Sequence, residues 1–590
     1  MKETYAKNLK TVVACLVLMA FFQGCQNRKP FTLTITHLND THGNLEPSEI
    51  KVPFNGIDTY AQMGGFPAVT AKVKQLRQSN QNFLFLHAGD VFQGSLYFIK
   101  YTGMAEAEFF KLMKPDAMCT GNHEFDKGAV PLVHFIDAVH DIFPVLSANI
   151  TIQPDSVAAG KIIPYTIKTF GKHKVAIIGI TTPETASVSS PGSRITFNDP
   201  IASVKPLVES LTRQNINIIV VLAHQGYSND IKMANAVPGI DIIVGGHTHT
   251  LLGQYDDIPS LSTEGLYPTQ VQKFPEGPTL IVQSWEKAKL LGILNTTFDK
   301  KGKVTHFTGS PVLLLGNKAE DFRQKDATGK KQPVTADTFK AIEAKIAHSS
   351  TMEIRTDDTE ALLLLSRFSG PVNELKKNVI GTCAEDLYHV REPGEKHKVA
   401  GIMKNGSLAA PLVADAFLWK AQSIQPKAPR IVIINGGGVR GDIPKGDLTI
   451  GGVYELLPFE NALVLFDLTG AQIKEVLKNT MQRSEADPDD NGAFPYTAGL
   501  RFTVNIKDTG TDFFSSIEEE TETGWVPLED NKVYHIATLS FIAGGKDGYT
   551  LFETVPNKIN TGFIDAEIFI DYIKKEHVLK APQTRGMVNR

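Results

Sequence analysis

The sequence predicts an α/β protein of two layered domains. Its 590 residues exceed what one hydrophobic core usually holds. From residue 31 to about residue 315, short apolar runs alternate with helical or loop stretches, and a second alternation of this kind runs from Val379 to about Lys575. Alternation of this kind is typical of sheets covered by helices, so we expect a layered sheet in each half.

The first 25 residues have the layout of an export signal. Three lysines precede an apolar stretch from Thr11 to Phe22, which is short for a stable membrane span. Phe22-Gln23-Gly24-Cys25 resembles a bacterial lipoprotein box, although such boxes favour Leu first and a small residue second. We expect acylation of Cys25 and attachment of an exported protein to a membrane, with simple export to the periplasm as the alternative.

Charge and cysteine content narrow the possible partners. A net charge of -4 provides no basic field for nucleic-acid polymers. Of the four cysteines, only Cys119 and Cys383 lie beyond the signal and its end, and they fall in different predicted domains. We expect two buried thiols there, because a disulfide needs close and correctly directed Cβ atoms.

The chain after the signal divides into three parts. We expect a catalytic domain over 31–316, a linker and connector helix over 317–378, and a C-terminal domain over 379–580. The connector is predicted from the helix-like segment between Asp357 and about Lys377, which Gly370-Pro371 should interrupt.

Five histidine- and aspartate-bearing motifs recur in the first half, and nearly all of them close an apolar run. They are Asp40-Thr41-His42, Gly89-Asp90, Gly121-Asn122-His123-Glu124, His224 and Gly246-His247-Thr248-His249. Four of the apolar runs that precede these motifs have the composition of buried parallel strands: Phe31 to Leu38, Phe83 to Leu86, Ile218 to Leu222 and Ile240 to Val244. Since the carboxyl ends of parallel strands share one crevice, we expect these side chains to converge.

The residue types indicate a site for two divalent ions, Zn, Mn or similar. Asp40 and His42 lie at i and i+2, on one face of the chain, and Asp90 can bridge two ions. Asn122 adds a neutral oxygen, and the remaining ligands would be His224, His247 and His249. Two such ions can activate a water for hydrolysis.

His123 follows a candidate ligand directly and is expected to point elsewhere in the crevice. With Asp126 three residues on, it could act as a general acid or as a charge stabiliser. Single strand-end histidines are more often core residues, which is how we interpret His37 and His87. Asp40 alone could be a turn former, but the ordered set of five motifs favours a metal centre.

The motif order resembles the calcineurin-like metallophosphoesterase superfamily. The fuller forms, His37 to Gly43 and Gly121 to Asp126, resemble the 5′-nucleotidase family. This resemblance implies a four-layer β-sandwich flanked by helices, joined by a connector helix to a smaller C-terminal α/β substrate-binding domain. It also implies a catalytic pair, His123 and Asp126, and two metal sites: Asp40, His42, Asp90 and His249 for one ion, and Asp90, Asn122, His224 and His247 for the other.

Three segments of the second domain are candidates for substrate binding. The turn Asn435 to Arg440 follows the apolar run Ile431 to Ile434. Its glycines, such as Gly437, allow a ligand to approach the backbone closely, and the Arg440 guanidinium can donate two parallel hydrogen bonds to a phosphate or carboxylate. An ordinary tight turn is the alternative. The other two segments resemble the family's nucleoside pocket and supply Phe459 with Asn461, and Phe541 with Asp547. Two aromatic faces can sandwich a base, although either phenylalanine alone is more often core.

One stretch departs from the family pattern. Where the family usually has one or two arginines, the chain reads Gly394 to Ala400, with Lys396 standing in for one and Ala400 for the other. A lysine loses the bidentate fork of arginine, although Arg391, Lys398 or Lys404 could compensate. UDP-sugar use is therefore less well supported than monophosphate hydrolysis.

The function expected from these residues and the resemblance is an exported 5′-nucleotidase that cleaves nucleoside 5′-monophosphates, with a nucleotide substrate and no protein partner. A 2′,3′-cyclic-nucleotide phosphodiesterase/3′-nucleotidase is the alternative within the same frame. An inactive surface nucleotide-binding lipoprotein is the alternative of another class. The intact ligand set argues against it.

Overall fold

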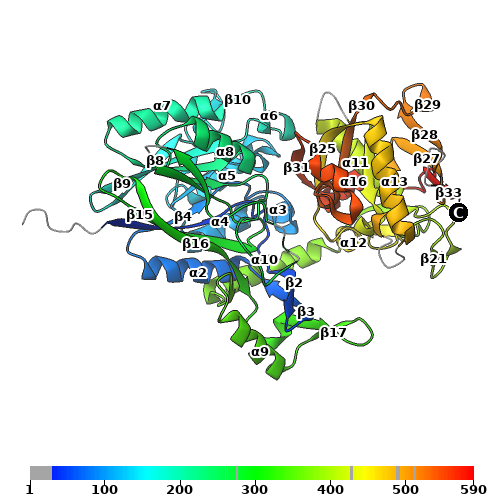
Figure 1. The fold of residues 1–590 in the computed structure, drawn as a ribbon, viewed down its shortest axis with the longest axis horizontal. Coiled ribbons are helices and arrows are strands. Elements are labelled where there is room, and N and C mark those ends of the chain that lie inside the picture. The colour runs from blue at the N-terminus through cyan, green and yellow to red at the C-terminus, as the bar shows by residue number, and fades with distance from the viewer. Residues whose placement is uncertain are drawn as a thin grey trace, which may run out of the picture.

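The computed structural model describes residues 30–259, 261, 263–273, 277–424, 429–486, 492–508 and 513–589. The expected signal and Cys25 lie outside these residues. The N-terminal half and the C-terminal half form two bodies side by side, and helix α10 (Thr359–Leu375) runs between them (Figure 1).

The first sheet of the N-terminal domain has 11 strands. Its parallel part is β1 (Phe31–Leu38), β4 (Phe83–His87), β5 (Ala117–Cys119) and β6 (Val145–Leu146). The antiparallel strands β15 (Leu290–Phe298) and β16 (Val304–Leu315) follow on the other side of β1. The sheet is completed by β2 (Ser48–Phe54), β3 (Ile57–Met63), β17 (Phe322–Lys325), β18 (Lys331–Pro333) and β19 (Met352–Ile354).

The second sheet has six strands in the order β13-β14-β12-β11-β9-β8. Its parallel strands are β9 (His173–Thr181), β11 (Ile218–His224), β12 (Ile242–Gly245) and β14 (Gly277–Val282). The antiparallel edges are β8 (Tyr165–Phe170) and β13 (Thr269–Lys273). A small sheet pairs β7 (Ile150–Ile152) with β10 (Ile195–Phe197).

The two sheets pack face to face, and helices cover their outer faces. Leu84 and Leu86 of β4 share a fully buried core with Val220 and Leu222 of β11. The first sheet is covered by α2 (Phe66–Ser79), α4 (Met104–Met113) and α5 (Ala129–Val139), and the second by α7 (Pro200–Arg213) and α8 (Tyr227–Ala236). Shorter helices are α3 (Leu96–Tyr101), η1 (His123–Phe125), α6 (Thr185–Val188) and η2 (Ala319–Asp321). This is the expected four-layer sandwich.

The four apolar runs expected as buried parallel strands are β1, β4, β11 and β12, and their side chains are almost entirely buried. They belong to two different sheets, however, with β1 and β4 in the first and β11 and β12 in the second. The carboxyl ends of both sheets meet at one crevice, where His224 at the end of β11 lies 2.9 Å from Asp90, which follows β4.

Part of the segment expected as a linker folds onto the first sheet. Strands β17, β18 and β19 pair with it, and α9 (Ala336–Ile346) packs beside them. Helix α10 begins at Thr359, where the Asp358 side chain accepts a hydrogen bond from the Ala361 amide at 3.0 Å. The expected interruption is absent, because α10 continues through Pro371 to Leu375. The predicted domain boundaries stay a prediction.

The C-terminal domain is built on a five-stranded sheet in the order β26-β23-β30-β25-β31. Its strands are β23 (Ile431–Asn435), β25 (Ala462–Thr469), β26 (Pro495–Ala498), β30 (Val533–Leu539) and β31 (Ile559–Ile564). The long helices are α11 (Ala409–Ile424), α13 (Gly470–Ala486) and α16 (Asp565–Glu576). Short ones are η3 (Gly436–Gly438), α12 (Ile450–Leu456), α14 (Ser540–Ala543), η6 (Lys546–Gly548) and α15 (Thr550–Thr554).

Smaller sheets complete this domain. They comprise β20 (Val379–Cys383), β24 (Gly446–Thr449) and β32 (Val578–Leu579); β27 (Leu500–Asn505), β28 (Phe514–Thr521), β29 (Gly524–Pro527) and β33 (Gly586–Asn589); and the hairpin β21 (Lys396–His397) with β22 (Gly401–Ile402). Cys119 and Cys383 are buried free thiols, as expected. Among the described helices, none combines the length and the apolar character needed to cross a membrane.

Candidate metal centre and substrate pocket

The five motifs place their side chains where the two sheets meet. Asp40 follows β1 by two residues, Asp90 follows β4 by three, and Asn122 follows β5 by three. His224 is the last residue of β11, and His247 follows β12 by two. The convergence expected from the strand ends is therefore observed.

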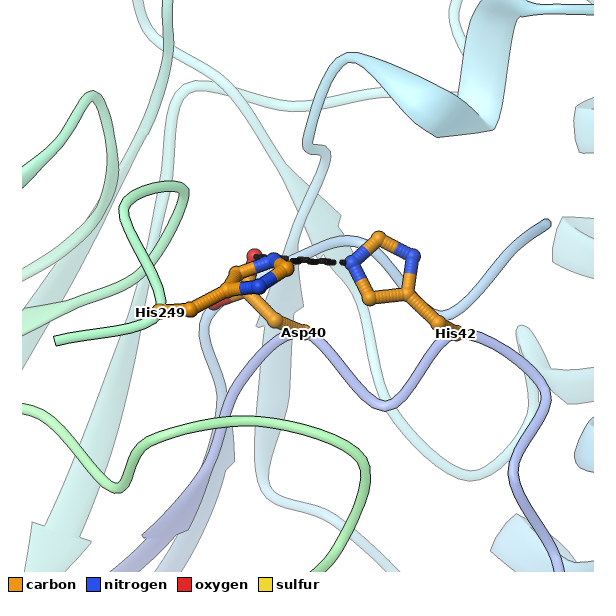
Figure 2. A group of neighbouring side chains, drawn as sticks. All are labelled: Asp40, His42 and His249. Atoms are coloured by element: carbon orange, nitrogen blue, oxygen red, sulfur yellow. Dashed lines mark hydrogen bonds and ion pairs between the residues drawn. The ribbon is translucent and has the colours of Figure 1, made fainter. Parts of the chain in front are cut away.

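One group of possible ligands consists of Asp40, His42 and His249 (Figure 2). The Nε2 atoms of His42 and His249 lie 3.0 Å apart, and Asp40 Oδ1 lies 3.4 Å from His249 Nε2. Three ligand atoms within 4.8 Å of one another can surround a single ion.

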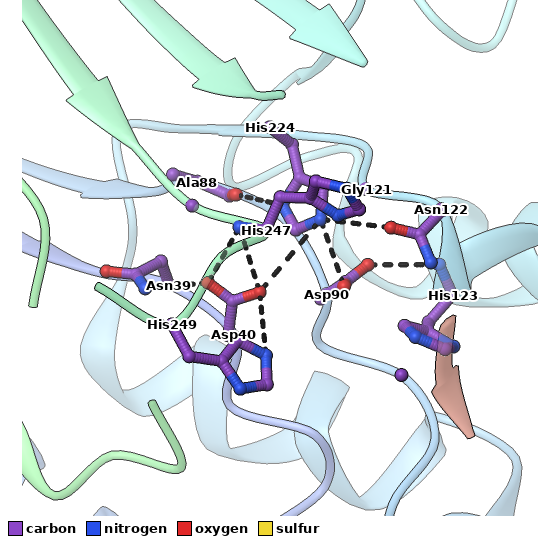
Figure 3. A network of polar contacts seen from close by, with 12 residues as sticks. Asn39, Asp40, Ala88, Asp90, Gly121, Asn122, His123, His224, His247 and His249 are labelled. Atoms are coloured by element: carbon purple, nitrogen blue, oxygen red, sulfur yellow. Dashed lines mark hydrogen bonds and ion pairs between the residues drawn. The ribbon is translucent and has the colours of Figure 1, made fainter. Parts of the chain in front are cut away.

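A second group consists of Asp90, His224 and His247, with Asn122 beside it (Figure 3). His224 Nε2 lies 2.9 Å from Asp90 Oδ2 and 3.3 Å from Asn122 Oδ1. Asp90 also forms a possible ligand group with His42 and His123. Asp90 thus lies between the two groups, where a carboxylate can bridge two ions.

The backbone at these residues is held in an uncommon conformation. The φ angle is positive at five of the motif residues: 48° at Asp40, 49° at His42, 54° at Asp90, 79° at His247 and 51° at His249. Left-handed backbone outside glycine costs free energy and persists only where the surroundings hold it, and it clusters at functional sites.

Acceptors behind the histidines orient the rings. His42 Nδ1 lies 3.2 Å from the carbonyl oxygen of Phe92, and His224 Nδ1 lies 2.7 Å from that of Ala88. His249 Nδ1 lies 2.9 Å from Glu286 Oε2. With Nδ1–H donating outward, each Nε2 lone pair faces the centre, which is the tautomer that a metal ion requires. The role of Glu286 was not predicted, because no local motif marks it.

Glu124 organises the loop that carries Asp90. Its Oε1 accepts hydrogen bonds from the amides of Val91 at 2.8 Å and Phe92 at 3.1 Å. Its Oε2 accepts from the amides of Asp90 at 3.0 Å and Gly121 at 2.6 Å. No role was predicted for Glu124 from the sequence, although its place in the Gly-Asn-His-Glu motif is a signal for one.

His123 and Asp126 form the expected pair. His123 Nδ1 lies 2.5 Å from Asp126 Oδ2, and both side chains are buried. Burial lowers the pKa of His123, but the charges of Asp126 and Asp90 outweigh it and raise the pKa to about 9. These two carboxylates therefore favour the protonated form of the ring.

The C-terminal domain covers the other side of His123. A Cβ atom on Gly562 of β31 would lie 1.7 Å from His123 Nε2, and the Phe563 ring meets the imidazole edge-on. Figure 3 shows this orange-red strand beside His123. Only a glycine fits here, and in this domain arrangement its backbone occupies the space in front of Nε2.

Two further contacts join the domains around this point. Lys287, 5% exposed, forms an ion pair with Glu460, and the Lys287 amide donates to Asp40 O at 2.6 Å. The Gly94 amide donates to Glu567 Oε1 of α16 at 3.2 Å. Through Lys287, the loop that carries Asp40 is linked to Glu460, which lies between Phe459 and Asn461 in the chain.

A pocket of about 400 Å³ lies wholly within the C-terminal domain. It is lined by Arg391, Asn435, Gly437, Gly438, Arg440, Phe459, Asn461, Gly492, Phe541 and Asp547. All the predicted substrate-binding residues line it except Lys396, which is exposed in the β21–β22 hairpin. Arg391, one of the three side chains expected to compensate, lines it instead.

Polar contacts shape this pocket and leave its aromatic faces open. Asn435 Nδ2 donates to Asp547 Oδ2 at 2.7 Å, and the Arg440 guanidinium lies 5.4 Å from the centre of the Phe459 ring. Phe459 and Phe541 are 51% and 44% exposed, which is unusual for large aromatic side chains. Two such rings can hold a planar base by stacking.

Both halves of the chain match known families. Residues 33–251 match the calcineurin-like phosphoesterase family model, and residues 379–554 match that of the 5′-nucleotidase C-terminal domain. The chain is 33% identical to the NAD 5′-nucleotidase of Haemophilus influenzae, over 93% of this chain and 91% of that protein. It is 32% identical to a probable 5′-nucleotidase of Treponema pallidum, over 95% and 94% of the two chains.

Solved structures agree with these matches. The Haemophilus influenzae NAD nucleotidase superposes with a TM-score of 0.81 at 31% identity, covering 95% of this chain and 100% of that one. A 5′-nucleotidase precursor from Thermus thermophilus superposes with a TM-score of 0.57 at 36% identity, covering 95% and 99%.

Proposed function

Since the chain belongs to the 5′-nucleotidase family and is a metal-dependent phosphomonoester hydrolase, we propose that it is an exported enzyme that hydrolyses nucleoside 5′-monophosphates to nucleoside and phosphate. The observation that carries the proposal is the pair of ligand groups meeting at Asp90, with the protonated His123 beside them. The open aromatic pocket supports a nucleotide as substrate.

The residues present fit two divalent ions. His42 Nε2 and His249 Nε2 lie 3.0 Å apart beside the Asp40 carboxylate, a separation at which all three side chains can ligate one cation. In this proposal Asp40, His42, Asp90 and His249 hold one ion, and Asp90, Asn122, His224 and His247 hold the other. Bound there, the ions supply positive charge that polarises the phosphate ester and acidifies a water. Nitrogen and oxygen donors together suit Zn or Mn.

His123 supplies a proton in the proposed reaction. Asp126 holds Nδ1–H, so the ring is fixed with Nε2–H directed at the space in front of it. From that atom the proton can pass to the ribose oxygen as the bond to phosphorus breaks, and the positive ring stabilises the charge that develops there. Gly562 must leave this position before a substrate oxygen can approach Nε2.

The nucleotide is proposed to bind first on the C-terminal domain. The base lies between Phe459 and Phe541, and Asn435 with Arg440 contacts the ribose or phosphate. Because the Gly562 backbone fills the space in front of His123 Nε2, this proposal requires the domains to rotate before the phosphate can reach the metal centre. The same rotation would remove Gly562 from His123.

A substrate panel tests this function. Phosphate release should be measured from AMP, 2′,3′-cyclic AMP, UDP-glucose and ATP with added Mn²⁺, Zn²⁺ or Mg²⁺. We expect AMP to be cleaved, whereas faster turnover of 2′,3′-cyclic AMP would favour the phosphodiesterase alternative. No release from any of them would leave only the inactive nucleotide-binding protein. His123→Ala should abolish most turnover while metal content is retained, and survival of activity would refute the role of His123.

A second candidate substrate is a dinucleotide such as NAD. Arg391 and Arg440 line one pocket, and burial followed by the charge of Arg391 lowers the pKa of Arg440. Two neighbouring guanidinium groups suit a pyrophosphate, and a 33% identical relative is named NAD 5′-nucleotidase. Arg391→Gln should therefore reduce the cleavage of NAD to AMP and nicotinamide mononucleotide more than it reduces AMP hydrolysis. Equal losses with both substrates would contradict this assignment.

Export and attachment form the remaining part of the proposal. The signal-like segment and Cys25 support a periplasmic or membrane-anchored protein. Mass spectrometry of the mature N-terminus distinguishes the two, because acylation adds lipid to Cys25 and Cys25→Ser releases the protein into the soluble fraction. A mature protein without lipid would leave simple export.

A further inference from the structure

A basic hollow lies at the end of the catalytic domain where the chain enters the fold. Its volume is about 640 Å³. The walls come from four places: Pro30 and Phe31 at the start of β1, Lys172 to Lys174 at the β8–β9 turn, Asn215, Asn217 and Ile218 at the start of β11, and Phe298 to Gly302 with Thr305 at the β15–β16 turn. We call this surface the basal face.

The charge on the basal face is unbalanced. Lys172, Lys174, Lys300 and Lys301 are exposed, and among the described residues none of their ammonium groups has a carboxylate partner. Among the described residues that line the hollow, Asp299 is the one acid, and its Oδ1 accepts hydrogen bonds from the amides of Lys301 at 2.8 Å and Lys303 at 2.9 Å. The chain as a whole carries a net charge of -4, so this face differs in sign from the average surface.

The four lysines are held on short, well-anchored turns. Lys172 and Lys174 flank His173, whose ring stacks on Phe31 at 4.3 Å between centroids. Lys300 and Lys301 occupy the tight turn that Asp299 closes with its side chain. Strands on both sides of each turn belong to the sandwich core, so the charges form a preorganised surface rather than a loose tail.

The position of Cys25 determines what this face would meet. Pro30, which lines the hollow, follows Cys25 by five residues, a span of at most about 18 Å when extended. If Cys25 is acylated, as in the proposed function on which this step rests, the basal face is held within that distance of the membrane. Exposed lysines this close to anionic headgroups are attracted to them.

We propose that the basal face docks on an anionic phospholipid surface, with Lys172, Lys174, Lys300 and Lys301 as its contacts. In Figure 1 the dark blue strand β1 starts at the left end of the molecule, and the C-terminal domain occupies the right end. Docking at the basal face leaves the metal centre, the pocket and the rotating domain pointing into solvent. The remaining, more acidic surface opposes other orientations.

The test measures vesicle binding without the lipid anchor. A chain starting at Gln26 keeps every described element, and its binding is compared on vesicles of phosphatidylcholine alone and of phosphatidylcholine with phosphatidylglycerol. A basal variant changes Lys172, Lys174, Lys300 and Lys301 to Gln. A matched control changes four exposed lysines of the C-terminal domain to Gln, namely Lys445, Lys507, Lys574 and Lys580.

We expect binding only to the vesicles that contain phosphatidylglycerol, and we expect salt to weaken it. The basal variant should bind roughly a thousandfold more weakly, whereas the control variant should keep most of the binding. Absence of binding to anionic vesicles overturns the proposal, and so does an equal loss in both variants. AMP hydrolysis in solution is measured on the same samples. Both variants should retain it, so failure of docking and failure of the proposed nucleotidase activity are distinguished.

Discussion

Replacement of Glu124 by Gln tests how the metal centre is organised. The Glu124 side chain is 1% exposed, and its two oxygens accept four backbone amides, two at each oxygen. A glutamine has the same shape but only one acceptor oxygen, so two amides would face its NH₂ group. Glu124→Gln therefore removes two hydrogen bonds and introduces donor–donor repulsion without changing the volume.

The size of the effect follows from those two bonds. Burial and the nearby charge of Asp90 raise the pKa of Glu124 to about 7, so the unfolding free energy is measured at pH 8, where the carboxyl is ionised. A hydrogen bond to a charged group contributes about 1.5–3 kcal/mol, so two of them correspond to about 3–6 kcal/mol of unfolding free energy. Because the four amides belong to the Asp90 loop and to Gly121, the geometry of Asp90 should also suffer. We expect metal affinity to fall by roughly 10- to 100-fold, as for other residues that support ligands.

The assay combines metal titration with urea unfolding and AMP turnover. Glu108→Gln is the matched control, because Glu108 makes a surface ion pair with Lys111 on α4. The control should behave like the parent protein, since such pairs contribute at most about 1 kcal/mol. Parental metal affinity and stability in Glu124→Gln would refute the role assigned to Glu124.

Three further changes test other parts of the structure. Burial without a hydrogen-bond partner raises the pKa of Glu106 to about 7, whereas the unfolded chain releases this proton near 4.5, so the free energy of unfolding falls as pH rises towards 7. Glu106→Gln should remove about 3 kcal/mol of that fall when urea unfolding is compared at pH 5 and pH 8. An unaltered pH profile would contradict the assignment. Phe541→Ala should raise KM for AMP roughly 5- to 150-fold, the equivalent of about 1–3 kcal/mol of stacking, with kcat retained, whereas the exposed control Val533→Ala should change neither. Lys287→Met should break the ion pair with Glu460 and increase amide exchange at Phe563 by roughly fivefold, equivalent to about 1 kcal/mol; unchanged exchange would mean that the pair does not hold the domains together.

Much of the metal centre could be predicted from the sequence because its information is local. Asp40 and Asp90 each follow an apolar run whose composition identifies a buried strand, and the run places the next few residues at the strand end. Histidine and carboxylate side chains in that position restrict the chemistry to a few possibilities. The pairing of His123 with Asp126 was also local, because three residues separate them.

Contacts between distant segments could not be predicted in the same way. Glu286 reaches His249 from another loop, and nothing near either residue signals the contact. Similarly, Lys396 was expected in the pocket on the basis of its place in a short stretch, whereas Arg391 lines the pocket and Lys396 lies on a separate hairpin. The path of a loop depends on what it packs against, and that is a tertiary property.

By itself, the sequence determined the α/β class, the identity of the converging side chains and the aromatic residues available to a base. Apolar periodicity and side-chain chemistry are carried by neighbouring residues, so they can be recognised without a structure. Only the tertiary structure decided that the ligands come from two sheets, that Glu124 holds the Asp90 loop, and that Gly562 covers His123. Those facts depend on packing between segments as much as 439 residues apart, where burial and close contact select one arrangement from many that the local pattern allows.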